Sequence, residues 1–340
     1  MPMKQPQSKQ GLAALIVLLL AAPAPAVAQA DDGVPALKIP ISAEAMSLGG
    51  VLPMLEGVDA VFFNPSGLAA VGHNAVTMTH AALHADTRLD AVGGASRLGN
   101  FGSLGVSAIA LTQDAITARN ADGLDAGSIT AYDAVVGLSW GRSIDDHNIG
   151  FGAKHVRQTL ADVTAQGFAF DLGYQYRFSR AVLGASVQNA GPAIRFIEES
   201  NPLPTTVAFG MKYDVKGILL LNTSIAHRPY VNRTITSLGA ELSLGQMTTL
   251  RAGYLAPLAA DASSAARALS NFGFGLGWRF PSKRFKIDYA MMPGDSDLGM
   301  THRFTMQLGW GKGGGSYSSR SMRDEGLDSP EYTTPFFQAL

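Results

Sequence analysis

Hydrophobic and polar positions alternate with a period of two residues over much of the chain. In the clearest window, 168–178 (FAFDLGYQYRF), Phe168 and Leu172 fall on one face, and Asp171 and Gln175 fall on the other. Successive side chains of a β-strand point to opposite faces, so this pattern predicts a strand with an apolar, aromatic face and a polar or small face. The same alternation recurs over 207–213, 271–280, 285–291 and 304–310.

About fourteen such strands are predicted along the chain. They begin near Asn74, Arg88, Phe101, Ser128, His147, Ala165, Arg180, Thr205, Gly217, Thr234, Met247, Asn271, Arg284 and Thr301. Most run roughly 9–13 residues, which is long enough for a tilted strand to cross a bilayer. Short connections such as 145–148 alternate with longer ones at 113–127, 190–204 and 257–270. This alternation is typical of periplasmic turns and external loops.

The composition of the two strand faces indicates which one meets lipid. The polar face consists largely of Gly and Ala with isolated charges of both signs, and the apolar face often ends in an aromatic residue, as at Trp278 and Trp310. Aromatic girdles and a small, polar inner face are typical of a membrane barrel. Every backbone group in lipid must be paired, so the sheet must close. We therefore predict an all-β fold, a transmembrane antiparallel β-barrel.

The N-terminus predicts export. Lys4 and Lys9 precede an apolar run of 12 residues at 11–22, and a small-x-small site (AQA) follows at 28–30. This arrangement is typical of a secretory signal peptide, and the run is too short to span a bilayer. We expect cleavage before Asp31 and a location in the outer membrane; an uncleaved anchor is the alternative.

Composition excludes several other classes of protein. The chain of 340 residues is 46% hydrophobic and only 16% charged, has a net charge of −1, and contains 38 Gly and no Cys. Low charge with this much apolar content excludes intrinsic disorder. The balance of acidic and basic residues excludes a nucleic-acid partner bound through a basic face. The absence of cysteine excludes disulfides and thiolate metal sites.

Four motifs in order along the chain carry a family resemblance. They are SLGG at 47–50 followed by DAVFFNPSGL at 59–68, VQNAGP at 187–192 followed by Leu203-Pro204, DYA at 288–290, and LGMTHR at 298–303. In these motifs the chain resembles the PorV/PorQ family of FadL-like outer-membrane barrels. It departs from the family pattern at Leu48, where Met is common, and at Ser66, where Ala is usual. The 30-residue tail is also longer than the family's.

The resemblance implies a fourteen-stranded barrel whose N-terminal segment folds into the lumen. With the predicted signal peptide (1–30), this gives a luminal plug (31–72), the barrel (73–310) and a flexible tail (311–340). The residues Asn64, Pro65, Ser66 and Gly67 would form a luminal hatch, and the other motif residues expected to be structural are Asn189, Gly191, Pro192, Thr301, His302 and Arg303. Without the resemblance, 59–68 is an apolar stretch ended by an ordinary turn, in which Gly67 permits an unusual backbone angle.

Isolated charges on the polar faces predict a luminal charge network. Its members are Asp171, Arg177, Arg279, Lys286 and Asp288. Buried charges need partners, so these residues either anchor the plug through ion pairs or line a polar conduit. The mixed signs favour anchoring.

Catalytic, metal and cofactor sites are not predicted. His80 and His84 are four residues apart on a predicted strand, which places them about 13 Å apart and prevents joint chelation. The Gly273-x-Gly275-x-Gly277 repeat lies within a strand with no helix after it, so it is not a dinucleotide loop. No Gly-x-Ser-x-Gly elbow is present. His302 is expected to be structural or to cap a turn, and the terminal patch 336–340 is either frayed or docks on a partner.

Two functions from different classes remain. The family resemblance implies a binding, shuttle or scaffold component of protein secretion or export at the cell surface, with secreted or surface proteins bearing a sorting signal as partners. The alternative is a FadL-like channel for the uptake of small hydrophobic compounds such as long-chain fatty acids. Both place the protein among outer-membrane lipids.

Overall fold

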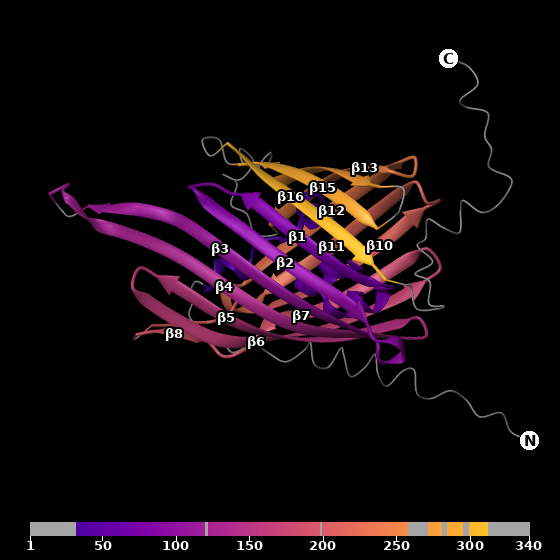
Figure 1. Ribbon diagram of the computed structural model, residues 1–340, viewed down its shortest axis with the longest axis horizontal. Helices are drawn as coiled ribbons and strands as arrows, with labels where there is room; N and C mark the ends of the chain where they lie inside the picture. Colours follow the sequence, from indigo (N-terminus) through magenta and orange to yellow (C-terminus); the bar gives the residue numbers. More distant parts are fainter. Residues whose placement is uncertain are drawn as a thin grey trace, which may run out of the picture.

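Over the residues described by the computed structural model, fourteen antiparallel strands close into one barrel (Figure 1). The structure describes residues 32–119, 122–197, 199–257, 271–280, 284–294 and 299–311. The barrel strands are β1 (Asn74–Ala82), β2 (Thr87–Arg97), β3 (Ser103–Arg119), β4 (Asp125–Ile144), β5 (His147–Leu160), β6 (Val163–Phe178), β7 (Ala181–Ala190), β10 (Thr206–Val215), β11 (Leu219–Arg228), β12 (Arg233–Leu244), β13 (Thr248–Pro257), β14 (Phe272–Arg279), β15 (Phe285–Pro293) and β16 (Met300–Trp310). Pairing of β1 with β16 closes the sheet.

The predicted strands and their order are confirmed. Each of the fourteen begins within three residues of the predicted position. The predicted orientation of the faces also agrees with the structure: Phe168 and Leu172 are 60% and 54% exposed, whereas Asp171, between them on β6, is 2% exposed. Large apolar side chains therefore cover the outer wall, as a barrel surrounded by lipid requires.

Two connections predicted as long loops contain strands. Residues 113–127 are mostly the ends of β3 and β4, whose hairpin projects beyond the rest of the barrel at one end (Figure 1). The two strands keep pairing after the apolar alternation stops, as far as Arg119 and Asp125. The connection at 190–204 contains a small separate hairpin of β8 (Ile194–Phe196) and β9 (Glu199–Asn201).

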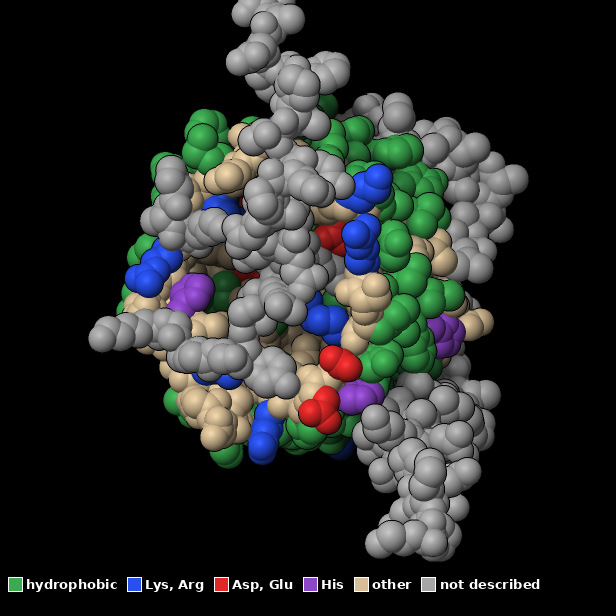
Figure 2. All heavy atoms as spheres, turned by 90° about the vertical axis from the view of Figure 1, so that its right-hand side faces the viewer, with side chains coloured by type: hydrophobic (Ala, Val, Ile, Leu, Met, Phe, Trp, Pro, Cys, Tyr) green, Lys and Arg blue, Asp and Glu red, His purple; other side chains and the backbone are tan. Residues whose placement is uncertain are grey.

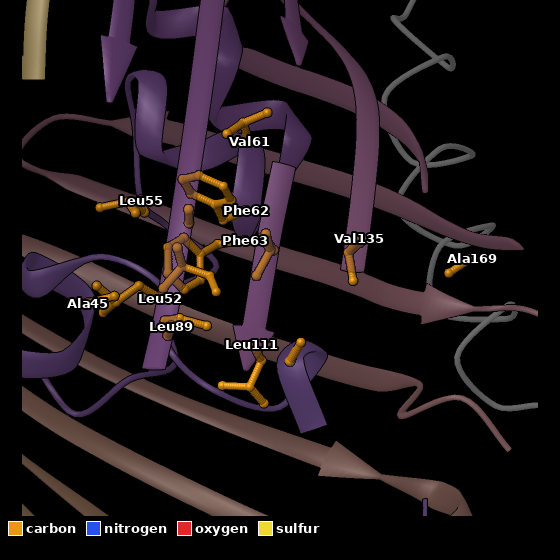
Figure 3. Close-up of a cluster of buried hydrophobic side chains, with 14 of the residues drawn as sticks. Ala45, Leu52, Leu55, Val61, Phe62, Phe63, Leu89, Leu111, Val135 and Ala169 are labelled. Atoms are coloured by element: carbon orange, nitrogen blue, oxygen red, sulfur yellow. The ribbon is translucent and has the colours of Figure 1, made fainter. Parts of the chain in front are cut away.

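Residues 32–72, here called the N-terminal segment, lie inside the barrel. The segment contains η1 (Pro35–Leu37), α2 (Ala43–Ser47), η2 (Val58–Phe62) and η3 (Pro65–Ala70); η4 (Gly99–Phe101) and η5 (Pro229–Val231) lie in connections between strands. The core of the molecule lies between the segment and the inner wall. In Figure 3, Phe62 and Phe63 of the segment lie near Leu89 of β2 and Leu111 of β3, within one buried cluster. No helix among the described residues is long and apolar enough to cross a membrane.

The two ends of the barrel differ. At one end the strands are joined by short turns such as 145–146, 179–180 and 216–218, and this end is called the turn end; the opposite end, towards which the β3–β4 hairpin projects, is the loop end. Figure 2 looks onto the turn end and shows Lys and Arg side chains around and within its opening, with hydrophobic side chains on the outer wall. The predicted signal peptide and nearly all of the predicted tail lie outside the described residues.

Candidate functional site

Glycines of the inner wall let the N-terminal segment approach the barrel backbone. A Cβ added to Gly173 of β6 would lie 1.8 Å from Asn64 Oδ1, and one added to Gly253 of β13 would lie 2.4 Å from the carbonyl carbon of Leu48. Gly273, in the Gly-x-Gly-x-Gly stretch of β14, would place a Cβ 2.4 Å from the Met46 carbonyl oxygen. The glycines on the predicted polar face therefore give room for the segment.

The four predicted hatch residues are all buried against the inner wall. Asn64 caps η3: its Oδ1 accepts hydrogen bonds from the Ser66 backbone N–H (3.1 Å) and the Ser66 hydroxyl (2.7 Å). Its Nδ2 donates to the carbonyl of Pro53 (2.5 Å) and to that of Ala185 on β7 (3.3 Å). Asn64 thus ties together two parts of the N-terminal segment and the wall.

Gly67 is required for a different reason from the one predicted. Its φ is not in the left-handed region, so an unusual backbone angle is not the cause. A Cβ at this position would lie 2.1 Å from the Leu55 carbonyl oxygen and 2.7 Å from the Ala60 side chain. The Gly67 carbonyl also accepts a hydrogen bond from the Gly57 N–H (3.2 Å). Close backbone approach is therefore what demands glycine.

Two glutamates of the N-terminal segment are bound to basic residues of the wall at the turn end. Glu56 accepts hydrogen bonds from Lys212 Nζ of β10 (2.6 Å) and from Arg177 of β6. Glu44 accepts one from Lys286 Nζ of β15 (2.5 Å). Burial alone would raise the pKa of Glu56, but the charges of Lys212 and Arg177 outweigh it and hold that pKa below its ordinary value. The pKa of Glu44 is lowered in the same way, chiefly by Lys286. Both carboxylates are therefore ionised at neutral pH.

A second layer of charge lies behind Glu44. Arg251 of β13 pairs with Glu241 of β12 (Nε to Oε2, 2.6 Å) and with Asp288 of β15 (Nη1 to Oδ1, 2.6 Å). Asp288 also lies 2.9 Å from Lys286 Nζ. Three of the five residues in the predicted charge network therefore act on the N-terminal segment. Arg177 and Lys286 bind its glutamates directly, and Asp288 pairs with Lys286.

Sequence reasoning missed most partners in this network. Lys212 and Arg251 lie at inner-face positions of alternating strands, so the period-two pattern was a signal that could have found them. Glu44 and Glu56 come from a segment without alternation, where nothing in the sequence indicated the side chains they meet. Arg279 faces the lumen as predicted, but the structure records no ion pair between it and any described residue.

Asp171 belongs to a separate network, which lies nearer the loop end of the barrel than Arg177 does. Its Oδ2 lies 2.7 Å from Lys154 Nζ of β5, and its Oδ1 accepts a hydrogen bond from the Asn189 backbone N–H (2.8 Å). Lys154 also donates to Asn189 Oδ1 (2.8 Å). Asn189 has a φ of 57°, a left-handed conformation that Asn tolerates, and sits where the pairing of β6 with β7 shifts register. The ion pair here lies within the wall and does not involve the segment.

The remaining motif residues have several environments. Gly191 lies so close to β6 that a Cβ would be 2.2 Å from the Phe168 carbonyl oxygen, and Pro192 is exposed. The Thr301 hydroxyl donates to the Met292 carbonyl (3.2 Å). His302 does not cap a turn: it lies within β16 on the outer face, where its Nδ1 is 2.7 Å from the Tyr289 hydroxyl.

Arg303 alone of these joins the segment to the last strand. It is buried and donates to the Pro40 carbonyl. The neighbouring β16 residue Thr305 accepts a hydrogen bond from the Ala43 N–H (2.9 Å) through its hydroxyl oxygen. The segment is therefore bonded to the closing strand at two points.

Three cavities follow one another through the lumen. A loop-end cavity of about 440 Å³ has a mostly apolar surface, to which Ile39, Leu83 and Leu111 contribute, and polar residues such as His84, Asp133 and Gln158 also border it. Ile39 also borders a middle cavity of about 100 Å³, which is lined by Phe62, Phe63 and Ile109. Leu52 separates that cavity from a turn-end cavity of about 260 Å³ among the basic residues described above. Ile39 and Leu52, the two side chains that lie between neighbouring cavities, both belong to the N-terminal segment.

The structure does not bring together His80 and His84, the two histidines considered above as metal ligands. His80 Nδ1 lies 2.7 Å from Asp90 Oδ1 on the exposed face of β1 and β2, whereas His84 borders the loop-end cavity. The two side chains therefore face different surroundings.

No family model and no curated protein matches the sequence. Among solved structures, the CymD monoaromatic hydrocarbon channel aligns with a TM-score of 0.64 at 10% identity, over 83% of this chain and 100% of CymD. A FadL homologue of Pseudomonas aeruginosa aligns with a TM-score of 0.53 at 11% identity, over 78% of this chain and 97% of its own.

A mutant of the TodX monoaromatic hydrocarbon channel gives a TM-score of 0.52 at 14% identity, over 78% of this chain and 96% of its own. Identities this low bear on the fold alone. The chain therefore has the fold of the FadL-like barrels, and its apolar outer wall supports a location in the outer membrane.

Proposed function

We propose that this protein is an outer-membrane channel for small hydrophobic compounds. The observation that carries the proposal is the succession of cavities through the lumen, which starts with an apolar chamber at the loop end. That chamber lies at the outer side if the short turns face the periplasm, as they do in barrels of this class. Apolar pockets of about 300–1,000 Å³ are typical of small-molecule sites, and the loop-end cavity falls within this range.

The fold agrees with this proposal. CymD and TodX are both described as monoaromatic hydrocarbon channels. The middle cavity has the smallest volume of the three and is bordered by the rings of Phe62 and Phe63. A compound that passes from the loop end must displace side chains there, so we expect the middle cavity to limit the rate.

The test is uptake into proteoliposomes that hold the full-length protein, with toluene and oleate as radiolabelled probes. We choose Ile109→Trp, because Ile109 of β3 is buried and borders the middle cavity. We expect at least a several-fold loss of uptake. Val106→Trp on the outer face of the same strand is the matched control, since Val106 is 57% exposed. Equal uptake by the two variants, or no uptake by the unaltered protein, would count against a channel.

The shuttle role implied by the PorV/PorQ resemblance stays a prediction from the four motifs, as does family membership. A pull-down from native outer membranes, followed by mass spectrometry of proteins and extracted lipids, separates the two. A stable partner protein bearing a sorting signal favours the shuttle, and co-purifying hydrophobic compounds favour the channel. That the chain is not an enzyme also stays a prediction.

A further inference from the structure

Arg279 is a cation for which the structure records no counter-ion. It lies at the end of β14, half-buried, and its side chain borders the turn-end cavity. Its direct neighbour across the strand pair is Lys286, another cation. Like charges directly opposite each other in a sheet are unfavourable. Among the described residues, no carboxylate forms an ion pair with Arg279, so its guanidinium is available to an anion in the cavity.

The acids around the cavity are already engaged elsewhere. Glu56 holds Lys212 and Arg177, Glu44 holds Lys286, and Glu241 holds Arg251. The cavity wall carries five basic residues and these three acidic ones, and Asp288 behind the wall also pairs with Arg251 and Lys286. Of the five, only Arg279 has no ion pair with a described residue. An anion that enters the cavity therefore meets a favourable charge at Arg279.

Apart from Asn222, the rest of the cavity wall carries no polar side chain. Leu48, Leu52 and Leu55 of the N-terminal segment and Leu220 of β11 border the same space of about 260 Å³. A bare inorganic anion would leave this apolar wall unused. A molecule with an anionic group at one end and a small apolar body would contact both kinds of surface.

We propose that the turn-end cavity is a binding site for small organic acids, with the carboxylate on Arg279 and the apolar body against the leucines. A guanidinium presents paired N–H donors that match the two oxygens of a carboxylate, which makes arginine well suited to this role. The site goes beyond the channel function proposed above. It lies at the opposite end of the lumen from the apolar chamber, and it requires a charge that toluene does not carry.

Benzoate and benzamide are the probes, because they share shape and differ in charge. Binding is measured at pH 7.5 by isothermal titration on the full-length protein in a nonionic detergent. We expect benzoate to bind and benzamide to bind at least about tenfold more weakly, the loss typical of a missing charge-assisted hydrogen bond. Arg279→Gln should weaken benzoate by a similar factor. Arg142→Gln is the matched control, since Arg142 is an exposed residue at the same end of the barrel but on the outer face.

The proposal is overturned if benzamide binds as well as benzoate, if Arg279→Gln leaves benzoate binding unchanged, or if inorganic phosphate competes as strongly as benzoate does. None of these measurements involves transport, so failure here and failure of the uptake test are distinguishable.

Discussion

Lys212 Nζ lies 2.6 Å from Glu56 Oε2, and this ion pair joins the barrel wall to the segment inside it. The two residues are separated by 156 positions in the chain. Arg177 shares the same carboxylate, so one acid of the N-terminal segment is held by two strands that are not neighbours in the sheet. Such a contact ties the segment to the wall through charge.

Removal of the Glu56 charge should loosen the N-terminal segment and leave the barrel closed. In Glu56→Gln, Lys212 and Arg177 lose their acid in a partly buried site, which we expect to ease local opening of residues 52–57 by about 1–2 kcal/mol. Hydrogen exchange of those backbone amides measures the change. Asp114→Asn is the control, because its pair with Arg88 is more than half exposed. Equal protection in Glu56→Gln and the unaltered protein would show that the ion pairs do not hold the segment.

A methyl group on the inner wall should displace the segment where one on the outer wall does not. In Gly173→Ala, the new Cβ would lie 1.8 Å from Asn64 Oδ1, so Asn64 must move and its hydrogen bonds to Ser66 and Pro53 weaken. We expect a loss of about 1–3 kcal/mol or more. Gly94→Ala on β2 is the control, since its Cβ would meet nothing closer than 3.5 Å. Thermal unfolding followed by circular dichroism compares the two, and equal midpoints would contradict this account.

Period-two alternation predicts the barrel because one physical cause acts on every strand: one face meets lipid and the other meets the lumen. The ribbon formed by the ends of β3 and β4 escaped prediction because it projects beyond the barrel. There Asp114 and Ile129 are both exposed, so the two faces no longer differ in their surroundings. Backbone pairing continues without any pattern of side chains to reveal it.

The contacts inside the lumen could be predicted only in part. A charge on an inner face predicts a partner, but it does not identify which one. Arg177 meets Glu56, whereas Asp171 meets Lys154 within the wall. The path of the N-terminal segment decides between such outcomes, and that path depends on long-range packing against glycines rather than on a local period. Gly67 shows the same limit, since its need for glycine comes from the distant carbonyl of Leu55.

A charge on the outer wall should be costly at mid-height and nearly harmless at the loop end. Leu172 of β6 and Met300 of β16 are 54% and 56% exposed on the outer face, but Met300 is the first residue of its strand at the loop end. For Leu172→Arg we expect a loss of about 2–4 kcal/mol in the folding free energy in lipid vesicles, against about 0–1 kcal/mol for Met300→Arg. Denaturant titration of folding into vesicles measures both. Equal losses would contradict the depth assigned to these two residues.

Neutralising Asp59 should stabilise the protein at neutral pH and have no effect in acid. Asp59 is buried in η2, and neither of its carboxylate oxygens accepts a hydrogen bond of ordinary geometry from a described residue; the Thr77 hydroxyl is the donor beside it. Burial raises the pKa of Asp59 from 3.8 to about 6, against the opposing charge of Lys286. The folded protein therefore holds this proton more tightly than the unfolded chain does. Stability falls as the pH rises from about 4 to about 6, and the full penalty applies above that range.

The variant Asp59→Asn carries no charge at any of these pH values, so it escapes the penalty. We expect it to be more stable than the unaltered protein by up to about 3 kcal/mol at pH 7.5, and equally stable at pH 3.5. Thermal unfolding of both proteins at the two pH values gives both differences in stability. Glu44 and Glu56 titrate in both proteins, so their contributions cancel in the comparison. Asp146→Asn in an exposed turn is the control and should show no such gain. A variant that is no more stable at pH 7.5 would mean that the Asp59 carboxylate has a compensating partner in the folded protein.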